Sequence, residues 1–227
     1  MVTGDADQAS QLEYPAPPWH LQGQLYGSIW AVPAGSFKYE LEPRFHSLRA
    51  LGYQGVFAGF VDYQDGSSLV YHELLAGLLV TRKGGLGTAF SITHMWVDSS
   101  ASRQGGREIW GVPKEMAQFD YHYSRGQRDL QASARSAEIA LANGNFKAVT
   151  PVLPWLRLPV FFPNWQFLQN RVVSSNGTFW CAPEFCRGGM VIPPESPLAS
   201  LGIAGRRPLL SFGGLAFKMF LKAARPL

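Results

Sequence analysis

Residues 105–116 read Gly-Gly-Arg-Glu-Ile-Trp-Gly-Val-Pro-Lys-Glu-Met, and they place one lysine, Lys114, directly after a proline and among large apolar side chains. Pro113 fixes its own φ angle and favours an extended conformation in the residue before it. Because alternate residues of an extended segment share a face, we expect Trp110, Lys114 and Met116 to point to one side. Glu115 would then point to the other side. The pattern predicts a lysine held in apolar surroundings.

A lysine in such surroundings can act as a nucleophile. A free lysine ammonium group has a pKa near 10.4, and only the unprotonated amine attacks a carbonyl carbon. Burial in an apolar site lowers a lysine pKa by roughly 3–5 units, because the charged form loses its hydration. A lysine that follows a proline is nevertheless most often a solvated turn residue. The local pattern alone therefore indicates a candidate and does not assign a function.

The composition indicates a folded, strand-rich chain. Of the 227 residues, 46% are hydrophobic and 16% are charged, which argues against disorder. The 24 glycines, 16 prolines and 13% aromatic residues favour many short strands joined by turns over a helical bundle. We expect an α+β, β-rich fold, with a flexible N-terminal lead at residues 1–13 and a single domain over residues 14–227.

Charge and cysteine content argue against several other classes of protein. The N-terminus lacks the basic-then-apolar order of a secretory signal, and no apolar run approaches the roughly 18 residues of a membrane-spanning helix. Cys181 and Cys186 are too few for a disulfide scaffold. The net charge of +4 is local to the C-terminal end, where five basic residues and no acidic residue follow Glu195. We therefore expect a cytoplasmic protein that binds no nucleic acid.

Local patterns predict strands on both sides of the lysine segment. They cover residues 19–32, 53–63, 68–81 and 88–97, a hairpin of 119–123 with 129–141, and later strands at 177–181 and 209–220. Helical spacing of apolar residues predicts a short helix within 37–51. Small polar residues predict a loop over 99–106. Four prolines in 151–163 exclude a central strand there and predict an extended cover over the core.

The lysine motif and three other segments resemble the acetoacetate decarboxylase family. Gly106-Arg-Glu-Ile-Trp-Gly-Val-Pro-Lys114 is similar to the Gly-Arg-Glu…Pro-Lys signature of that family. The segments Pro17-Pro-Trp-His20, Tyr71-His-Glu73 and Ile192-Pro-Pro-Glu-Ser-Pro197 add to the likeness, which runs from about Tyr14 to the C-terminus. The resemblance implies a β-barrel core with surrounding strands and a few short helices, and it implies assembly into a homo-oligomer.

The resemblance also implies a cofactor-free carbon–carbon lyase that acts on small oxo acids. Lys114 would be the Schiff-base nucleophile, and Glu73 would orient the substrate or transfer a proton. Gln24 stands near the position of the family's substrate-binding arginine. The remaining substrate-binding residues implied by the likeness are Tyr71, Trp110 and Met116. No cofactor and no metal ion are expected.

The chain departs from the family pattern at three positions. Glu115 replaces a second lysine, Gln24 replaces the arginine, and Ala58 falls where the family has a second glutamate. Without the arginine, the carboxylate of acetoacetate lacks its bidentate partner. Two alternatives therefore stay open: an aldolase-dehydratase-type Schiff-base lyase, and a non-enzymatic barrel that binds a small molecule.

Overall fold

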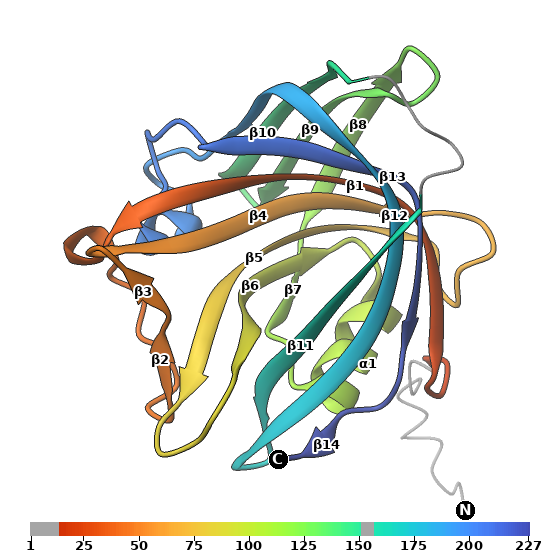
Figure 1. Cartoon of the computed structure of the whole chain (residues 1–227). Coiled ribbons are helices and arrows are strands. Elements are labelled where there is room, and N and C mark those ends of the chain that lie inside the picture. The colour runs from red at the N-terminus through yellow and green to blue at the C-terminus, as the bar shows by residue number, and fades with distance from the viewer. Residues whose placement is uncertain (1–13, 151–156) are drawn as a thin grey trace, which may run out of the picture.

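The computed structural model describes residues 14–150 and 157–227, most of which lie in strands (Figure 1). The strands are β1 (Trp19–Pro33), β2 (Phe45–Ser47), β3 (Arg49–Ala50), β4 (Tyr53–Tyr63), β5 (Tyr71–Arg82), β6 (Thr88–Val97), β7 (Lys114–Met116), β8 (Gln118–Ser124), β9 (Asp129–Ser136), β10 (Ile139–Ala148), β11 (Leu158–Leu168), β12 (Arg171–Val191), β13 (Leu210–Leu221) and β14 (Arg225–Pro226). The helices are α1 (Ser100–Trp110) and two 3-10 turns, η1 (Ala34–Ser36) and η2 (Pro197–Leu201). The expected lead at 1–13 lies outside the described residues.

The strands form one sheet that closes on itself. Neighbouring strands follow the order β11-β6-β5-β4-β1-β13-β12, and β12 pairs with β11 again to complete a ring. The first half of β12 pairs with β11 and its second half pairs with β10, from which β9 and β8 continue. In Figure 1, β8, β9 and β10 lie above the ring as a second layer. The predicted β-rich fold, with a ring of strands at its core and further strands around it, is confirmed.

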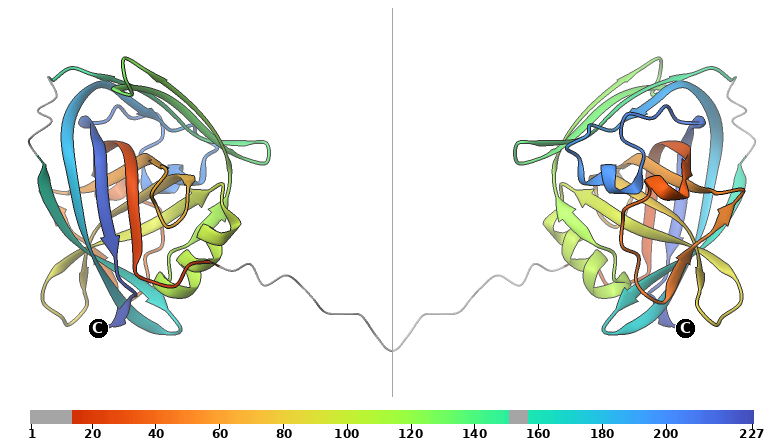
Figure 2. Two further views of the ribbon diagram at one scale, coloured as in Figure 1. Left: turned by 90° about the vertical axis from the view of Figure 1, so that its right-hand side faces the viewer. Right: turned by 90° about the vertical axis from the view of Figure 1, so that its left-hand side faces the viewer.

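Side chains of β1, β4 and β5 alternate between two buried faces. One face packs against β8, β9 and β10, where Trp30, Phe60 and Phe146 are fully buried. The other face lines the interior of the ring, because the cluster on it draws residues from β1, β4, β5, β6, β12 and β13. Trp110 from α1 joins this interior cluster, and α1 covers one flank of the molecule (Figure 2). Within the described residues, no helix has the length and apolar character needed to span a membrane.

The predicted strands at 53–63 and 88–97 coincide with β4 and β6, whereas three other local predictions differ from the structure. Residues 37–51 form no helix, since Leu48 and Leu51 are exposed and the spaced apolar residues share no buried face. Residues 99–106, predicted as a loop, supply the cap and the first half of α1. The predicted strand over 129–141 is divided by a turn at Ala137, whose φ is 49°.

The proline-rich segment is also different from the prediction. Residues 151–156 lie outside the described residues, but from Leu158 onward the chain forms β11, which closes the ring. β11 pairs with β12 along its whole length and with β6 at Asn164 alone among the described pairs. Pro159 and Pro163 therefore lie in a strand that has a regular neighbour on one side only, which is where proline is tolerated.

Two caps fix the ends of α1. The Ser99 side chain accepts a hydrogen bond from the Ser102 N–H at 3.2 Å. Gly111 ends the helix in the left-handed conformation with φ 66°, and a side chain there would also meet the Phe167 carbonyl oxygen at 2.6 Å. The chain then turns sharply into β7.

Gly106 lets α1 lie directly against the lysine side chain of β7. A Cβ atom at this position would stand 2.5 Å from Lys114 Cδ and 2.7 Å from Lys114 Cε. The next residue, Arg107, donates its Nε–H to the Lys114 carbonyl oxygen at 2.6 Å and pairs with Glu115. Helix α1 thus holds both the backbone and the side chain of Lys114.

Gly106→Ala should therefore destabilise the protein, although alanine is the better helix former by about 1 kcal/mol. The added methyl group meets two methylene carbons of a buried side chain, and overpacking of this kind costs about 1–3 kcal/mol. We expect a net loss of about 1 kcal/mol in the free energy of unfolding, measured with urea.

Gly35→Ala is the matched control, because a Cβ atom there meets nothing within 4 Å. Its unfolding free energy should change by less than about 0.5 kcal/mol. A Gly106→Ala protein more stable than the wild type would contradict the packing described here.

Candidate active site

The strand register separates the predicted site residues into two faces of the sheet. Across β4 and β5, Glu73 shares its row with Val61 and faces the ring interior. Gln24 on β1 shares the neighbouring row with Asp62, and successive residues of a strand point to opposite faces. The Gln24 amide donates to Gln127 Oε1 at 3.2 Å on the far side of the sheet. The structure therefore does not bring Gln24 to Glu73.

Lys114 reaches the same interior face as Glu73. β7 pairs in parallel with β6, so that Lys114 is aligned with the buried Met95. The aliphatic part of its side chain passes Gly106, and Nζ donates to Ser102 Oγ at 2.8 Å. Ser102 lies one helical turn before Gly106, so the lysine side chain runs along α1 toward the helix N-terminus.

Lys114 and Glu73 meet in a buried polar cluster. Lys114 Nζ lies 3.1 Å from Glu73 Oε2 and donates to the Tyr71 hydroxyl at 3.3 Å. Tyr63 donates to Glu73 Oε1 at 3.2 Å and Tyr71 donates to Oε2 at 3.4 Å. Lys114 is only 5% exposed and Glu73 only 2%. One carboxylate thus has three donors around it, in a place from which bulk water is excluded.

The two tyrosines act as neutral donors. Burial raises the pKa of Tyr63 and of Tyr71 well above the ordinary value of 10.0, and the charge of Glu73 raises both further. Their rings lie 4.4 Å apart, and Lys114 Nζ lies 4.9 Å from the centroid of the Tyr71 ring. Both hydroxyl groups therefore keep their protons at neutral pH.

The surroundings of the amine are more polar than the residues next to Lys114 predict. Those residues predicted apolar surroundings and the family resemblance added Glu73; in the structure, Nζ contacts that carboxylate and two hydroxyl groups. Removal from water disfavours an ammonium ion, whereas an adjacent carboxylate favours it. Because Ser102 belongs to the first turn of α1, the partial positive charge of the helix N-terminus also lies near Nζ.

The other predicted lining residues have different places. Trp110 donates its ring N–H to the Lys222 carbonyl oxygen at 2.7 Å and packs edge-to-face on Trp19, with 4.7 Å between ring centroids. It is part of the packed interior, in the same apolar cluster as Tyr63 and Tyr71. Met116 lies two residues beyond Lys114 on β7, on the same side of the strand, and packs against the interior cluster.

Glu115 points away from the amine. Its side chain is exposed and forms an ion pair with Arg107, as expected from the alternation along β7. Ala58, which the family resemblance led us to expect at the position of a second glutamate, is fully buried on the face opposite Glu73. Of the residues predicted for the site, the structure brings together Lys114, Glu73 and Tyr71.

Two members of the cluster were not predicted from the sequence. Tyr63 is the direct cross-strand partner of Tyr71 in the β4–β5 hairpin, a relation that correct strand ends would reveal. Ser102 was assigned to a loop. Its spacing of four residues from Gly106 places both on one side of a helix, so a helix prediction over 100–110 would have aligned them with the lysine.

A small cleft of about 150 Å³ lies beside the start of β7. Gly111, Pro113, Ile92, Thr93 and Phe167 are among its lining residues. Pro113 directly precedes Lys114, the first residue of β7, so a residue next to the lysine in the sequence lines this cleft. Neither Lys114 nor Glu73 lines it.

Comparisons with solved structures identify proteins of the same fold. An acetoacetate decarboxylase from Legionella pneumophila is 18% identical, with a TM-score of 0.72, and the match covers 94% of this chain and 88% of that one. The enduracididine biosynthesis enzyme MppR, solved in complex with pyruvate, is 15% identical, with a TM-score of 0.65 and coverage of 96% and 93%. An acetoacetate decarboxylase-like enzyme from Sphingomonas wittichii RW1 is 13% identical, with a TM-score of 0.67 and coverage of 100% and 99%.

No curated protein matches the sequence. The family model for acetoacetate decarboxylase matches residues 47–179, which is more than half of the chain and includes Glu73 and the lysine motif. The chain therefore belongs to the acetoacetate decarboxylase family.

Proposed function

We propose that this protein is a cofactor-free carbon–carbon lyase that decarboxylates a small oxo acid through a Schiff base at Lys114. The observation that carries the proposal is the 3.1 Å contact between Lys114 Nζ and Glu73 Oε2, made by two side chains that are almost fully buried. A nucleophile with a proton acceptor at hydrogen-bonding distance is the arrangement that amine catalysis needs.

Glu73 supplies the means to free the amine of its proton. In a medium of low polarity, a neutral amine beside a carboxylic acid becomes more favourable relative to the ion pair, because two charges no longer need solvation. Transfer of one proton from Lys114 to Glu73 therefore leaves a nucleophile and an acid in contact. Tyr63 and Tyr71 stabilise Glu73 when it is charged and hold its orientation.

The proposed reaction proceeds in four balanced steps. The Lys114 amine attacks the ketone carbon of a β-oxo acid to give a carbinolamine, which takes the proton of Glu73 and loses water to form an iminium ion. The bond to the carboxylate carbon then breaks, its electron pair moves into the iminium group, and CO2 leaves with formation of an enamine. The Glu73 carboxylate takes up one proton from solvent and passes it to the enamine carbon, which restores the iminium ion. Water then hydrolyses the iminium ion to the ketone and the Lys114 amine, and Glu73 takes up the proton released in this step.

The lack of a second cation among the described polar contacts of Lys114 Nζ affects how a substrate carboxylate binds and how readily it leaves as CO2. Within the described residues, the polar contacts of Nζ include neither arginine nor a second lysine, and Glu115 faces the opposite side of β7. A substrate carboxylate in this place would have no ion-pair partner, so its loss as CO2 removes a buried charge. The same feature weakens binding of the oxo acid before reaction.

An aldolase-dehydratase-type lyase is the second candidate. MppR, which shares the fold, has been solved in complex with pyruvate and with the condensation product of pyruvate and imidazole 4-carboxaldehyde. The same lysine could form an imine with a 2-oxo acid without release of CO2. A non-enzymatic barrel that binds a small molecule is the third possibility, and the following experiment separates all three.

Lys114 should be trapped by sodium borohydride in the presence of acetoacetate or, separately, of pyruvate. The intact mass should rise by one reduced adduct, and peptide mapping should place it on Lys114. Lys114→Arg, which keeps the positive charge but cannot form the imine, should give no adduct while its circular dichroism stays native. An adduct on exposed Lys218 in place of Lys114 would contradict the proposal.

Release of CO2 distinguishes the remaining outcomes. Decarboxylation predicts that CO2 forms in step with loss of the oxo acid, whereas trapping without CO2 assigns the aldolase-dehydratase-type reaction. If no member of a wide panel of oxo acids is trapped, Lys114 is not a Schiff-base nucleophile, and the binding barrel is the better account.

Glu73→Gln should impair turnover more than imine formation. The amide cannot carry the proton to the carbinolamine or to the enamine, and loss of a general acid–base group lowers kcat by about 10²–10⁴-fold. Single-turnover trapping, which needs fewer proton transfers, should slow by only about 10-fold. Glu115→Gln changes an exposed carboxylate on β7, the strand that carries Lys114, and should keep wild-type kcat. Equal losses in kcat and trapping rate would limit Glu73 to holding the lysine.

Self-association is a further part of the proposal. β11 and the facing part of β12 expose large apolar side chains, among them Phe161 at 71% and Trp180 at 43%. Exposed apolar groups of this size are typical of an interface. Phe161→Asp should lower the mass measured by light scattering with size-exclusion chromatography. A wild-type chain that elutes as a monomer would rule out a homo-oligomer under those conditions.

A further inference from the structure

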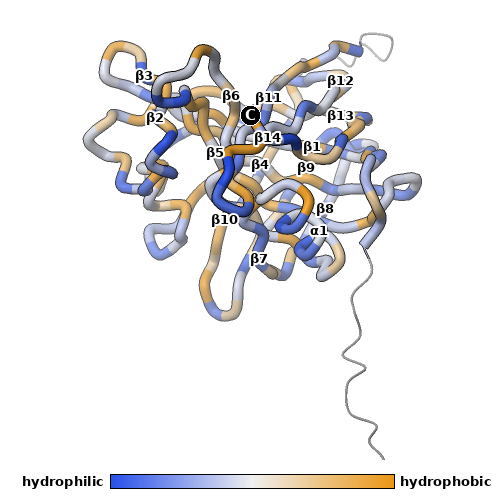
Figure 3. The backbone as a smooth tube through the Cα atoms, turned by 90° about the horizontal axis from the view of Figure 1, so that it is seen from below, coloured by the Kyte–Doolittle hydropathy of each residue, from blue (hydrophilic) through white to orange (hydrophobic). Residues whose placement is uncertain are grey.

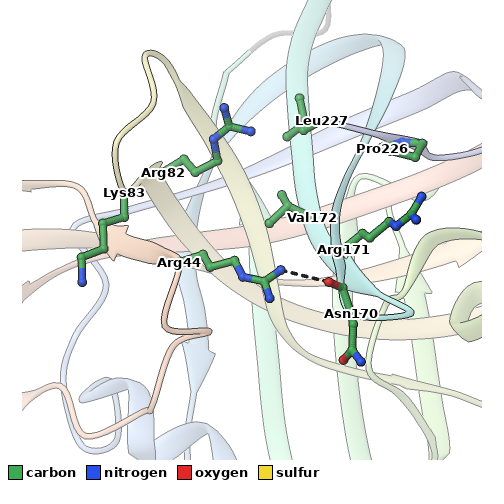
Figure 4. Close-up of a pocket in the computed structure, with 8 residues that line it drawn as sticks. All are labelled: Arg44, Arg82, Lys83, Asn170, Arg171, Val172, Pro226 and Leu227. Carbon is green, nitrogen blue, oxygen red and sulfur yellow. Dashed lines mark hydrogen bonds between the residues drawn. The ribbon is translucent and has the colours of Figure 1, made fainter.

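A second cleft, larger than the one beside β7, lies away from the lysine cluster (Figure 4). Its volume is about 470 Å³, and it is lined by Arg44, Arg82, Lys83, Asn170, Arg171, Val172, Pro226 and Leu227. These residues come from the segment before β2, the end of β5 with the turn after it, the β11–β12 turn with the start of β12, and β14 with the residue that follows it. The elements meet at the lower end of the molecule in Figure 1, and Figure 3 views the molecule from that end.

The cleft concentrates positive charge without a matching negative side chain. Four of its lining side chains are basic and none is acidic, and the α-carboxylate of Leu227 is the negative group among the lining residues. The side chains of Arg82, Lys83 and Arg171 have neither an ion-pair partner nor a hydrogen-bond acceptor among the described residues. In Figure 4, Lys83 points away from the three arginines, so the arginines are the groups best placed to contact a ligand.

Arg44 is already held in position by the protein. Its Nη1 donates to the Asn170 carbonyl oxygen at 3.2 Å, and its guanidinium carbon lies 4.6 Å from the centroid of the Phe167 ring. A weak ion pair joins Arg44 Nε to the partly exposed Glu42, at 3.6 Å. The remaining Nη2 donors of Arg44 have no partner among the described residues.

The backbone around the cleft is also fixed. The Lys83 N–H donates to the Arg44 carbonyl oxygen at 2.8 Å, which ties the β5–β6 turn to the segment before β2. Gln169 and Asn170 both have positive φ, at 48° and 62°, so they form the tight turn that presents Arg171 at the start of β12. The frame therefore exists before a ligand arrives, which reduces the loss of conformational entropy on binding.

We propose that this cleft binds a small phosphorylated molecule. Arginine presents a planar set of donors that matches the oxygens of a phosphate group. Arg82 and Arg171, which have no ion-pair partner among the described residues, favour a ligand with more than one negative charge. The volume lies within the roughly 300–1,000 Å³ typical of small-molecule sites. Val172, Pro226 and Leu227 offer an apolar wall for the carbon skeleton.

The test is calorimetric titration of the full chain with inorganic pyrophosphate at low ionic strength. The wild type should show saturable binding with one site per chain. Arg82→Gln combined with Arg171→Gln should weaken binding by at least about 10-fold, because two charge-assisted contacts are lost. Arg207→Gln combined with Lys218→Gln removes the same net charge from exposed positions outside the cleft, and should change the affinity by less than about 2-fold.

Equal weakening by the two double variants would assign the binding to net charge and overturn the proposal. Absence of saturable binding to the wild type at millimolar pyrophosphate would overturn it as well. Lys114→Arg should bind pyrophosphate as the wild type does, since Lys114 does not line the cleft. The pyrophosphate titration therefore tests the basic cleft separately from the Schiff-base chemistry of Lys114.

Discussion

The contact between a buried lysine and a buried carboxylate is the interaction on which the rest of the site depends. Taking Lys114 and Glu73 out of water is unfavourable, and removal of one partner from such a pair typically costs about 3–5 kcal/mol. Apolar residues of similar volume would often stabilise the same space equally well or better. A polar cluster inside the ring is therefore better explained by chemistry than by stability. Tyr63 and Tyr71 complete it by satisfying oxygens that no water can reach.

Helix α1 gives this pair its geometry. Gly106 leaves space for the Lys114 side chain, and Ser102 Oγ accepts a hydrogen bond from Lys114 Nζ. Arg107 donates a hydrogen bond to the Lys114 carbonyl oxygen. The Arg107–Glu115 ion pair lies outside the ring, so the acidic residue that replaces the family's second lysine does not face the amine. The helix N-terminus supplies some positive potential where that second lysine is missing. Gly106 and Ser102 lower the intrinsic helix propensity of α1, but their small side chains let the Lys114 side chain lie directly against the helix.

The sequence predicted much of the framework because strands carry a strong local signal. β4 and β6 coincide with expectation, since their apolar residues are bounded by Gly, Asp and Ser turns. Lys114 and Glu73 were recognised from motifs, and Tyr71 follows from its place two residues before Glu73. Helix α1 was missed because Gly105 and Gly106 lower helix propensity, and only tertiary contact with Lys114 and Trp19 explains them. The apolar spacing within 37–51 predicted a helix wrongly, because a helix needs its spaced apolar residues on one buried face and Leu51 is 99% exposed.

Gln24 shows why site residues are harder to predict than strands. A one-residue difference in register moves a side chain to the other face of a sheet, and a count along the sequence does not determine register across three strands. The basic cleft could not be predicted for a similar reason, because Arg44, Arg82 and Arg171 meet only after the ring has closed. The sequence indicated a basic C-terminal end, but which basic side chains lie together depends on how the strands close into a ring.

The most direct test of the account is a crystal structure of the protein after borohydride reduction with a small oxo acid. We expect continuous electron density from Lys114 Nζ into the substrate carbon skeleton, with the Glu73 carboxyl group in contact with the new secondary amine. Unmodified Lys114 pointing into solvent, with Glu73 bound to another partner, would contradict it.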